Sequence, residues 1–100
     1  MRRSGVKLHA DARAEALEAQ AWYWERSEGA GDAFLLELEQ ALDEIAENPD
    51  RWPSYLGGTR RFALRRFPYL LVYRRKARGV QVIAVAHAKR RPGYWRPRLY

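Results

Sequence analysis

The 100-residue sequence predicts an α+β fold in the order β-α-α-β-β-β, with a helical hairpin packed on a small, mainly antiparallel sheet. In the first half, apolar residues recur every three or four positions, which is the spacing of one helix face. In the second half, runs of branched and aromatic residues alternate with Gly and Pro. We expect a single domain over residues 1–100, with the hairpin at about 11–48, the sheet at about 60–87 and a tail at 88–100.

The first strand and first helix follow from two short patterns. Val6–His9 alternates apolar and polar residues, which predicts a short strand. Asp11 follows, and a carboxylate suits the N-cap of a helix. The buried face of that helix is predicted to carry the apolar residues at helical spacing, namely Ala14, Leu17, Ala21 and Trp24.

Residues 22–24 are three consecutive aromatic residues, and they cannot share one helix face because neighbours point about 100° apart. Trp24 continues the predicted buried face, so Trp22 and Tyr23 lie partly outside it. These two side chains either pack under the tail, against Tyr94 and Trp95, or form a surface for a partner.

The second helix has the clearest pattern. The segment Glu28–Gly31 interrupts the first helix, so we expect Gly29 to be its C-cap and Asp32 to cap the next helix. Pro49 ends the second helix. Its apolar stripe comprises Leu35, Leu38, Leu42 and Ile45, with Phe34 and Ala41 beside it. So short a connection predicts an antiparallel hairpin.

Three strands are predicted after the turn at Gly57–Gly58, at 61–65, 69–75 and 80–87. In the first of them, Phe62 and Leu64 share one face. The last is apolar on both faces, which indicates a central strand covered on both sides. Residues 77–79 form the turn before it, and Pro and Gly in the tail disfavour long regular structure there.

The charge is divided unevenly between the two halves. Residues 1–50 hold all 12 acids and five bases, for a net charge of −7, whereas residues 51–100 hold 14 bases and no acid. An anionic partner, either a nucleic acid or an acidic protein, would explain this division. The predicted sheet carries half of these bases, namely Arg60, Arg61, Arg65, Arg66, Arg74, Arg75 and Arg78.

Several classes of function are excluded by composition. The absence of Cys removes disulfides, thiolate metal sites and cysteine nucleophiles. With only two His residues as well, we expect no metal site and no cofactor. No apolar run approaches the roughly 18 residues of a membrane helix, and no apolar segment follows Arg2 and Arg3 as it would in a signal peptide. We therefore expect a cytoplasmic protein.

The order and spacing of several motifs resemble one family over nearly the whole chain. One stretch reads Arg61-x-x-Leu64-x-Arg66-Phe67-Pro68-Tyr69-x-x-x-Tyr73. The next reads Val80-x-Val82-Ile83-Ala84-Val85-x-His87-x-x-Arg90-x-Pro92-x-Tyr94-Trp95. Residues 16–23 and 48–53 agree with the first helix and the hinge of the same family. This pattern resembles the RelE/ParE superfamily of type II toxin–antitoxin toxins, and its ParE-like, plasmid stabilisation branch in particular.

The resemblance implies a β-α-α-β-β-β fold and a co-encoded antitoxin that binds the toxin in a hetero-oligomer. ParE-like members inhibit DNA gyrase, and the motif order favours this branch. RelE-like members instead enter the ribosome and cleave mRNA without a metal. A third possibility is a basic nucleic-acid-binding domain that is not toxic.

If the chain were an endoribonuclease, it would need a base, an acid and cations for the phosphate. The candidates are His87, Tyr94 and Arg65, with Arg90 and Arg91 available to hold phosphate. His87 has a structural alternative, in which it caps the strand and binds the tail. RelE-like nucleases generally also carry lysines on the sheet, a pattern that this sequence departs from. We expect target or antitoxin binding to involve Arg61, Arg65, Arg74, Arg90, Arg91 and Trp95.

Overall fold

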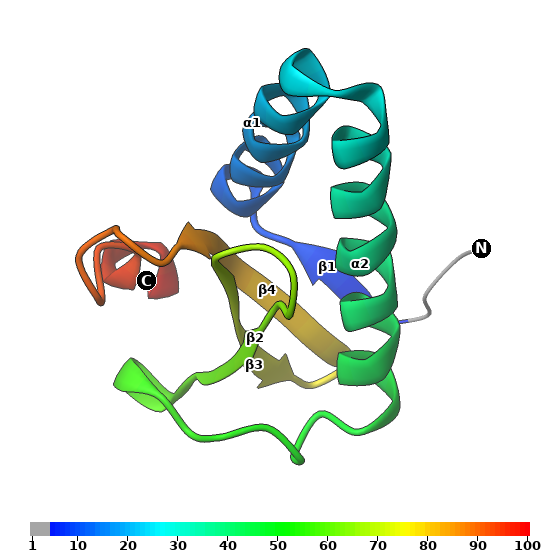
Figure 1. Cartoon of the computed structure of the whole chain (residues 1–100). Coiled ribbons are helices and arrows are strands. Elements are labelled where there is room, and N and C mark those ends of the chain that lie inside the picture. The colour runs from blue at the N-terminus through cyan, green and yellow to red at the C-terminus, as the bar shows by residue number, and fades with distance from the viewer. Residues whose placement is uncertain (1–4) are drawn as a thin grey trace.

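The computed structural model describes residues 5–100, so Arg2 and Arg3 lie outside the described residues. The elements follow in the predicted order (Figure 1). They are β1 (Val6–Leu8), α1 (Ala10–Arg26), α2 (Glu28–Glu47), β2 (Arg60–Ala63), β3 (Tyr69–Lys76) and β4 (Gly79–His87), with 3₁₀ turns at Leu56–Gly58 and Arg96–Leu99. The predicted α+β fold is therefore confirmed.

The four strands form one mixed sheet in the order β1-β4-β3-β2. β1 runs parallel to β4, and the other two pairs are antiparallel. As predicted from its apolar faces, β4 is central. Its register with β3 shifts once: Val72 pairs with Ala84 and Tyr73 with Val82, so Ile83 is an extra residue in β4.

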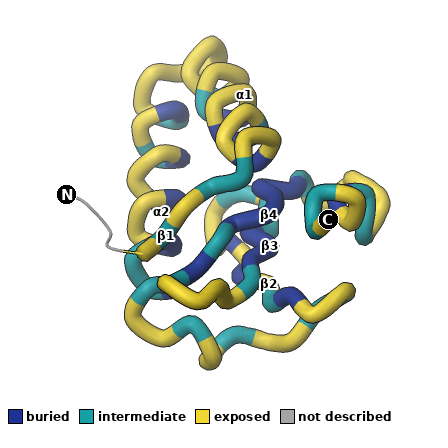
Figure 2. Tube along the Cα trace, turned by 180° about the vertical axis from the view of Figure 1, so that it is seen from behind, coloured by how far each residue is buried: buried dark blue, intermediate teal, exposed yellow. Residues whose placement is uncertain are grey.

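The two faces of the sheet are covered differently. The helical hairpin covers one face, which we call the helix face, and a core of residues such as Phe34, Leu38 and Leu71 fills the space between them. The tail and the loop before β2 cover part of the opposite face, which we call the rear face, where Trp95 is only 1% exposed. Figure 2 shows the buried course of β4 between these layers.

α1 differs from its prediction at its start. His9, and not Asp11, is the N-cap, because the Nδ1 of His9 accepts a hydrogen bond from the Asp11 backbone N–H at 3.0 Å. The Asp11 carboxylate sits instead in the first turn, where the helix dipole still favours it.

The buried face of α1 also differs from its prediction. It consists of Ala12, Ala16 and Ala19. Leu17 is 59% exposed and Trp24 is 49% exposed, so the predicted stripe faces outward. Small side chains on the buried face allow α1 to approach both α2 and β4 closely.

The connection between the helices is shorter than predicted. Ser27 alone serves as the C-cap of α1 and the N-cap of α2, and its hydroxyl accepts from the Ala30 N–H at 3.3 Å. Gly29 and Asp32 are therefore not caps but lie inside α2. Gly31 is buried against Trp24, where a Cβ atom would lie 2.6 Å from the Trp24 side chain. This glycine permits the close approach of the two helices, a packing requirement that the sequence pattern does not display.

α2 ends before Pro49, as predicted, and the buried residues Leu38, Leu42 and Ile45 confirm most of its stripe. Leu35, at 36% exposure, lies at the margin of that stripe.

Candidate functional site

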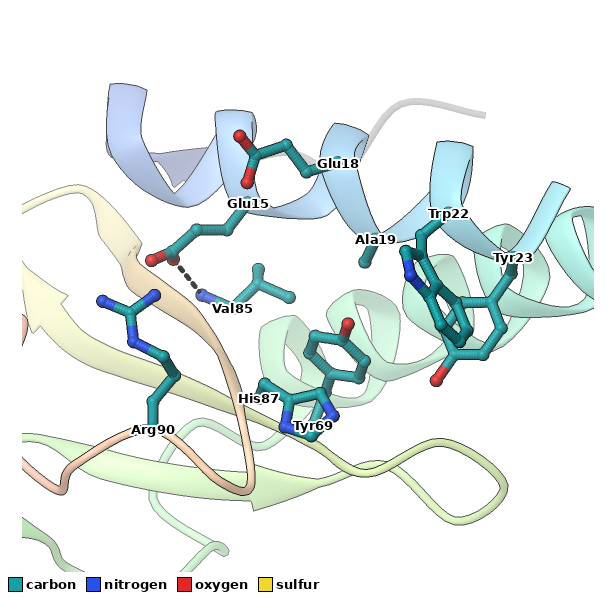
Figure 3. A pocket seen from close by; sticks show the side chains of 9 residues that line it. All are labelled: Glu15, Glu18, Ala19, Trp22, Tyr23, Tyr69, Val85, His87 and Arg90. Atoms are coloured by element: carbon teal, nitrogen blue, oxygen red, sulfur yellow. Dashed lines mark hydrogen bonds between the residues drawn. The ribbon is translucent and has the colours of Figure 1, made fainter. Parts of the chain in front are cut away.

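A pocket of about 380 Å³ lies between α1 and the end of β4 (Figure 3). It is lined by Glu15, Glu18, Ala19, Trp22, Tyr23, Tyr69, Val85, His87 and Arg90. α1 supplies two carboxylates and two aromatic rings, the end of β4 supplies the imidazole of His87, and the turn after β4 supplies the guanidinium of Arg90. Two residues predicted for a functional site, His87 and Arg90, are thus brought together.

The aromatic wall of the pocket is centred on Tyr23. Its ring stacks on Phe34 at 5.6 Å between centroids and meets the edges of Phe67 at 4.8 Å and Trp22 at 5.0 Å. The expected packing of Trp22 and Tyr23 against Tyr94 and Trp95 is therefore wrong, since Tyr23 belongs to the helix-face core. Burial raises the pKa of both Tyr23 and Tyr69, so their phenols are neutral at physiological pH.

His87 ends β4 and packs edge-on against Tyr69, with 5.0 Å between ring centroids. Its Nδ1 accepts a hydrogen bond from the Lys89 backbone N–H at 3.0 Å. A neutral imidazole with Nδ1 as acceptor carries its proton on Nε2. In this arrangement the ring fixes the turn after β4 and can offer a donor, rather than a base, from Nε2.

The carboxylate of Glu15 connects three elements. It accepts hydrogen bonds from the Val85 backbone N–H (2.9 Å), the Tyr94 hydroxyl (2.6 Å) and both terminal nitrogens of Arg98 (3.0 and 2.8 Å). Arg98 also donates to the Ile83 carbonyl at 3.0 Å. The Glu15–Arg98 pair therefore satisfies the edge of β4 beyond the end of β1, and it anchors the tail to α1.

These contacts set the protonation states of Glu15 and Tyr94. Burial opposes ionisation of Glu15, but the hydrogen bonds from Arg98, Tyr94 and Val85 outweigh it and lower its pKa below 4.5. Burial, together with the hydrogen bond to Glu15, raises the pKa of Tyr94. The Tyr94 hydroxyl therefore keeps its proton and donates it in a hydrogen bond to Glu15. No sequence pattern predicts this cluster, because its members are 70 to 83 residues apart from Glu15.

The other residues predicted for catalysis or binding are dispersed. The backbone N–H of Arg65 donates to Glu37 of α2, and Arg65 lines a different pocket, with Leu36 and Phe62. The structure thus does not assemble Arg65 with His87. Trp95 is 1% exposed and lies behind the sheet beside Tyr55, so its predicted contact with a partner stays a prediction that this burial does not favour.

The remaining arginines are divided between the two faces of the sheet. On the helix face, Arg66 and Arg75 pair with Glu37 and Asp50 at 3.7 and 2.9 Å. On the rear face, Arg61 lies over the Tyr55 ring and Arg74 donates to the Leu99 carbonyl at 3.1 Å. In the tail, Arg90 stacks on Tyr94 at 3.8 Å, and Arg91 is exposed.

Residues 5–100 show neither a cluster of metal ligands nor a membrane-spanning helix. Within residues 5–100, no three His, Asp or Glu side chains come together in a way that could hold a metal ion. Neither helix in this range combines the length and apolar character needed to cross a bilayer.

A helical hairpin on a four-stranded mixed sheet is the architecture implied by the family that the sequence motifs resemble. The chain belongs to the ParE toxin family of the parDE type II toxin–antitoxin system, whose family model matches residues 6–92. Among solved structures, it is similar to the chromosomal ParDE toxin–antitoxin system from P. aeruginosa, with a TM-score of 0.68 and 22% identity over 87% of this chain and 98% of that chain. A search of curated proteins gives no match.

Proposed function

We propose that this ParE-family chain arrests growth by inhibiting DNA gyrase, and that a co-encoded antitoxin neutralises it in the cytoplasm. The observation that carries the proposal is the family match over residues 6–92, which covers both helices and the entire sheet.

The outward face of α1 supports antitoxin docking. Leu17 and Trp24 line a shallow groove with Ala21, and their side chains are 59% and 49% exposed. Large apolar side chains grouped on one helix face are typical of a protein interface. Since a toxin of this family has a protein antitoxin, we assign this face to an apolar segment of that antitoxin.

The competing function is mRNA cleavage, which His87 and Arg90 favour by lining one pocket. Three observations count against it: the Nδ1 of His87 accepts from the Lys89 backbone N–H, the Tyr94 hydroxyl donates to Glu15, and Arg65 lines a different pocket. A general base and acid must be free to exchange protons with the substrate.

One experiment separates these functions. The chain is expressed from an inducible promoter, with and without the neighbouring reading frame, while plasmid supercoiling and mRNA integrity are followed. We expect growth arrest, rescue by the neighbour, loss of supercoiling and intact mRNA. Purified chain should likewise inhibit gyrase supercoiling of relaxed plasmid in vitro.

Two variants sharpen the result. If gyrase is the target, His87→Ala should still arrest growth. If the parent chain cleaves mRNA and the His87→Ala variant leaves it intact, the gyrase proposal is refuted. Trp24→Ser should retain toxicity but weaken rescue by the antitoxin. The matched control is Leu36→Ser, an exposed leucine of α2 outside the α1 groove. Equal rescue of both variants would contradict the docking assignment.

A further inference from the structure

A row of hydrogen-bond donors crosses the rear face of the sheet. Lys7 of β1 is in register with Gln81 of β4, and Gln81 is in register with Arg74 of β3. Val6 and Leu8 pack in the helix-face core, so the alternation of the strand turns Lys7 to the rear. Neighbouring strands are about 4.8 Å apart, so the three side chains span a continuous strip.

Arg74 is held in position by two neutral acceptors. Its Nε donates to the Gln81 Oε1 at 3.1 Å, and one terminal nitrogen donates to the Leu99 carbonyl at 3.1 Å. Because Oε1 is occupied, the free end of Gln81 is its NH₂ group, which only donates. Every unused polar group of the strip is therefore a donor.

The cationic strip extends towards the turn between β3 and β4. Lys76 lies two residues beyond Arg74 on the same face, and Arg78 follows in the turn. Together with Lys7 and Gln81, they line a hollow of about 320 Å³. Within residues 5–100, Lys7, Lys76 and Arg78 form no ion pair, and no strand of the sheet contains an Asp or Glu.

The position of the apolar residues indicates which anion fits. A protein interface draws most of its affinity from large apolar or aromatic anchors. The large exposed apolar side chains of the described chain lie on the two helices or at Tyr100, and none lies on a strand. A surface of donors and cations without such anchors suits a repeating phosphate backbone better than an acidic protein segment.

We propose that the rear-face strip, formed by Lys7, Arg74, Lys76, Arg78 and Gln81, binds the phosphodiester backbone of a nucleic acid without reading its sequence. Each cation that neutralises a phosphate of a duplex should steepen the dependence of log Kobs on log[salt] by roughly 0.9. Four cations therefore predict a slope of about −3.6 for duplex DNA. This inference does not depend on the identity of the toxin's target.

Fluorescence anisotropy with a labelled 20-base-pair duplex of mixed sequence, titrated between 50 and 200 mM NaCl, tests the proposal. The test variant is Lys7→Gln/Lys76→Gln. The control is Arg13→Gln/Arg65→Gln, which removes the same charge from α1 and from the loop bound to α2. The test variant should weaken binding at least tenfold and flatten the slope by about 1.8, while the control stays near the parent protein.

Each outcome of these titrations either supports or overturns the proposal. Parallel titrations with a single-stranded RNA show whether the strip binds RNA, duplex DNA or both. Binding of either nucleic acid, weakened in the test variant as described, supports the proposal. Equal slopes for the test and control variants would overturn it, as would no binding at 50 mM NaCl. If the test variant bound nucleic acid normally but lost its antitoxin, the strip would be a protein-binding surface instead. Circular dichroism confirms that both variants are folded.

Discussion

Replacing Glu15 with Gln should destabilise the protein by about 3 kcal/mol. The side chains of Glu15 and Arg98 are only 14% and 15% exposed, so solvent screens their pairing weakly. Gln retains one acceptor for four donated hydrogen bonds, and bonds to charged groups contribute about 1.5–3 kcal/mol each. The loss is below the sum because Arg98 keeps Asp11 at 3.6 Å.

Urea unfolding followed by circular dichroism measures this loss. At an m-value near 1.5 kcal/mol/M, the midpoint should fall by about 2 M. Because Arg98 also anchors the tail, limited trypsin digestion should cut the variant earlier within 90–98. The control is Glu18→Gln, an exposed carboxylate one turn further along α1 at the rim of the same pocket, which should change stability by less than about 0.5 kcal/mol.

A Glu15→Gln midpoint within error of the Glu18→Gln midpoint would refute the reasoning. It would mean that the hydrogen bonds around Glu15 are exchanged for water without net cost.

Three further predictions concern pH and packing. Because the native pKa of Glu15 lies below 4.5, its stabilisation is present above pH 4.5 and lost as the pH falls below that value. In an acid titration, the free energy of unfolding of Glu15→Gln should therefore fall less steeply with pH than that of the parent protein. Burial raises the pKa of Tyr73 to about 12, so stability should fall as the pH rises from 10 to 12; Tyr73→Phe should reduce that loss but cost about 1 kcal/mol at pH 7, because its bond to the Pro49 carbonyl disappears. Gly31→Ala should lower the melting temperature through its clash with Trp24, whereas Gly29→Ala, with its nearest contact at 3.6 Å, should raise it; equal shifts would contradict the packing argument.

The sheet could be predicted because its signals are local. The apolar run at 80–87 has no polar face, and a strand without a polar face must be covered on both sides. The structure confirms this with Val82 and Val85 against the helices, and Ile83 and Ala84 against the tail. The parallel pairing of β1 with β4 joins segments that are 74 residues apart, as in Val6 with Val80, and strand periodicity carries no such information.

The orientation of α1 could not be predicted for a different reason. Alanines occur on every side of this helix, so its apolar pattern fits more than one face. Large apolar residues usually mark the buried face of a helix, so the sequence predicts that the face with Leu17 and Trp24 is buried. The close contacts with α2 and β4 leave space only for Ala12, Ala16 and Ala19, and tertiary packing therefore decided the orientation.

Sequence patterns could indicate only some of the residues of the candidate site. The sequence indicated His87 because it ends a strand, and Arg90 as a cation that could hold phosphate, and the structure brings both to one pocket. Glu15 resembled any solvated helix carboxylate, and its role depends on Tyr94 and Arg98 in the tail. A contact between residues 79 or more positions apart, made by charged side chains, leaves no periodic signal.

The positions of the carboxylates explain why the cationic surface lies at the rear. The acids of the first half neutralise the arginines that they can reach: Glu15 pairs with Arg98, Glu37 with Arg66, and Asp50 with Arg75. All three acids belong to the helices or to the loop that follows them, so they approach the helix face and the tail. Among residues 5–100, Lys7, Lys76 and Arg78 at the rear form no such ion pair. An anionic ligand and an apolar antitoxin segment would therefore approach opposite sides of the toxin, and each could bind without displacing the other.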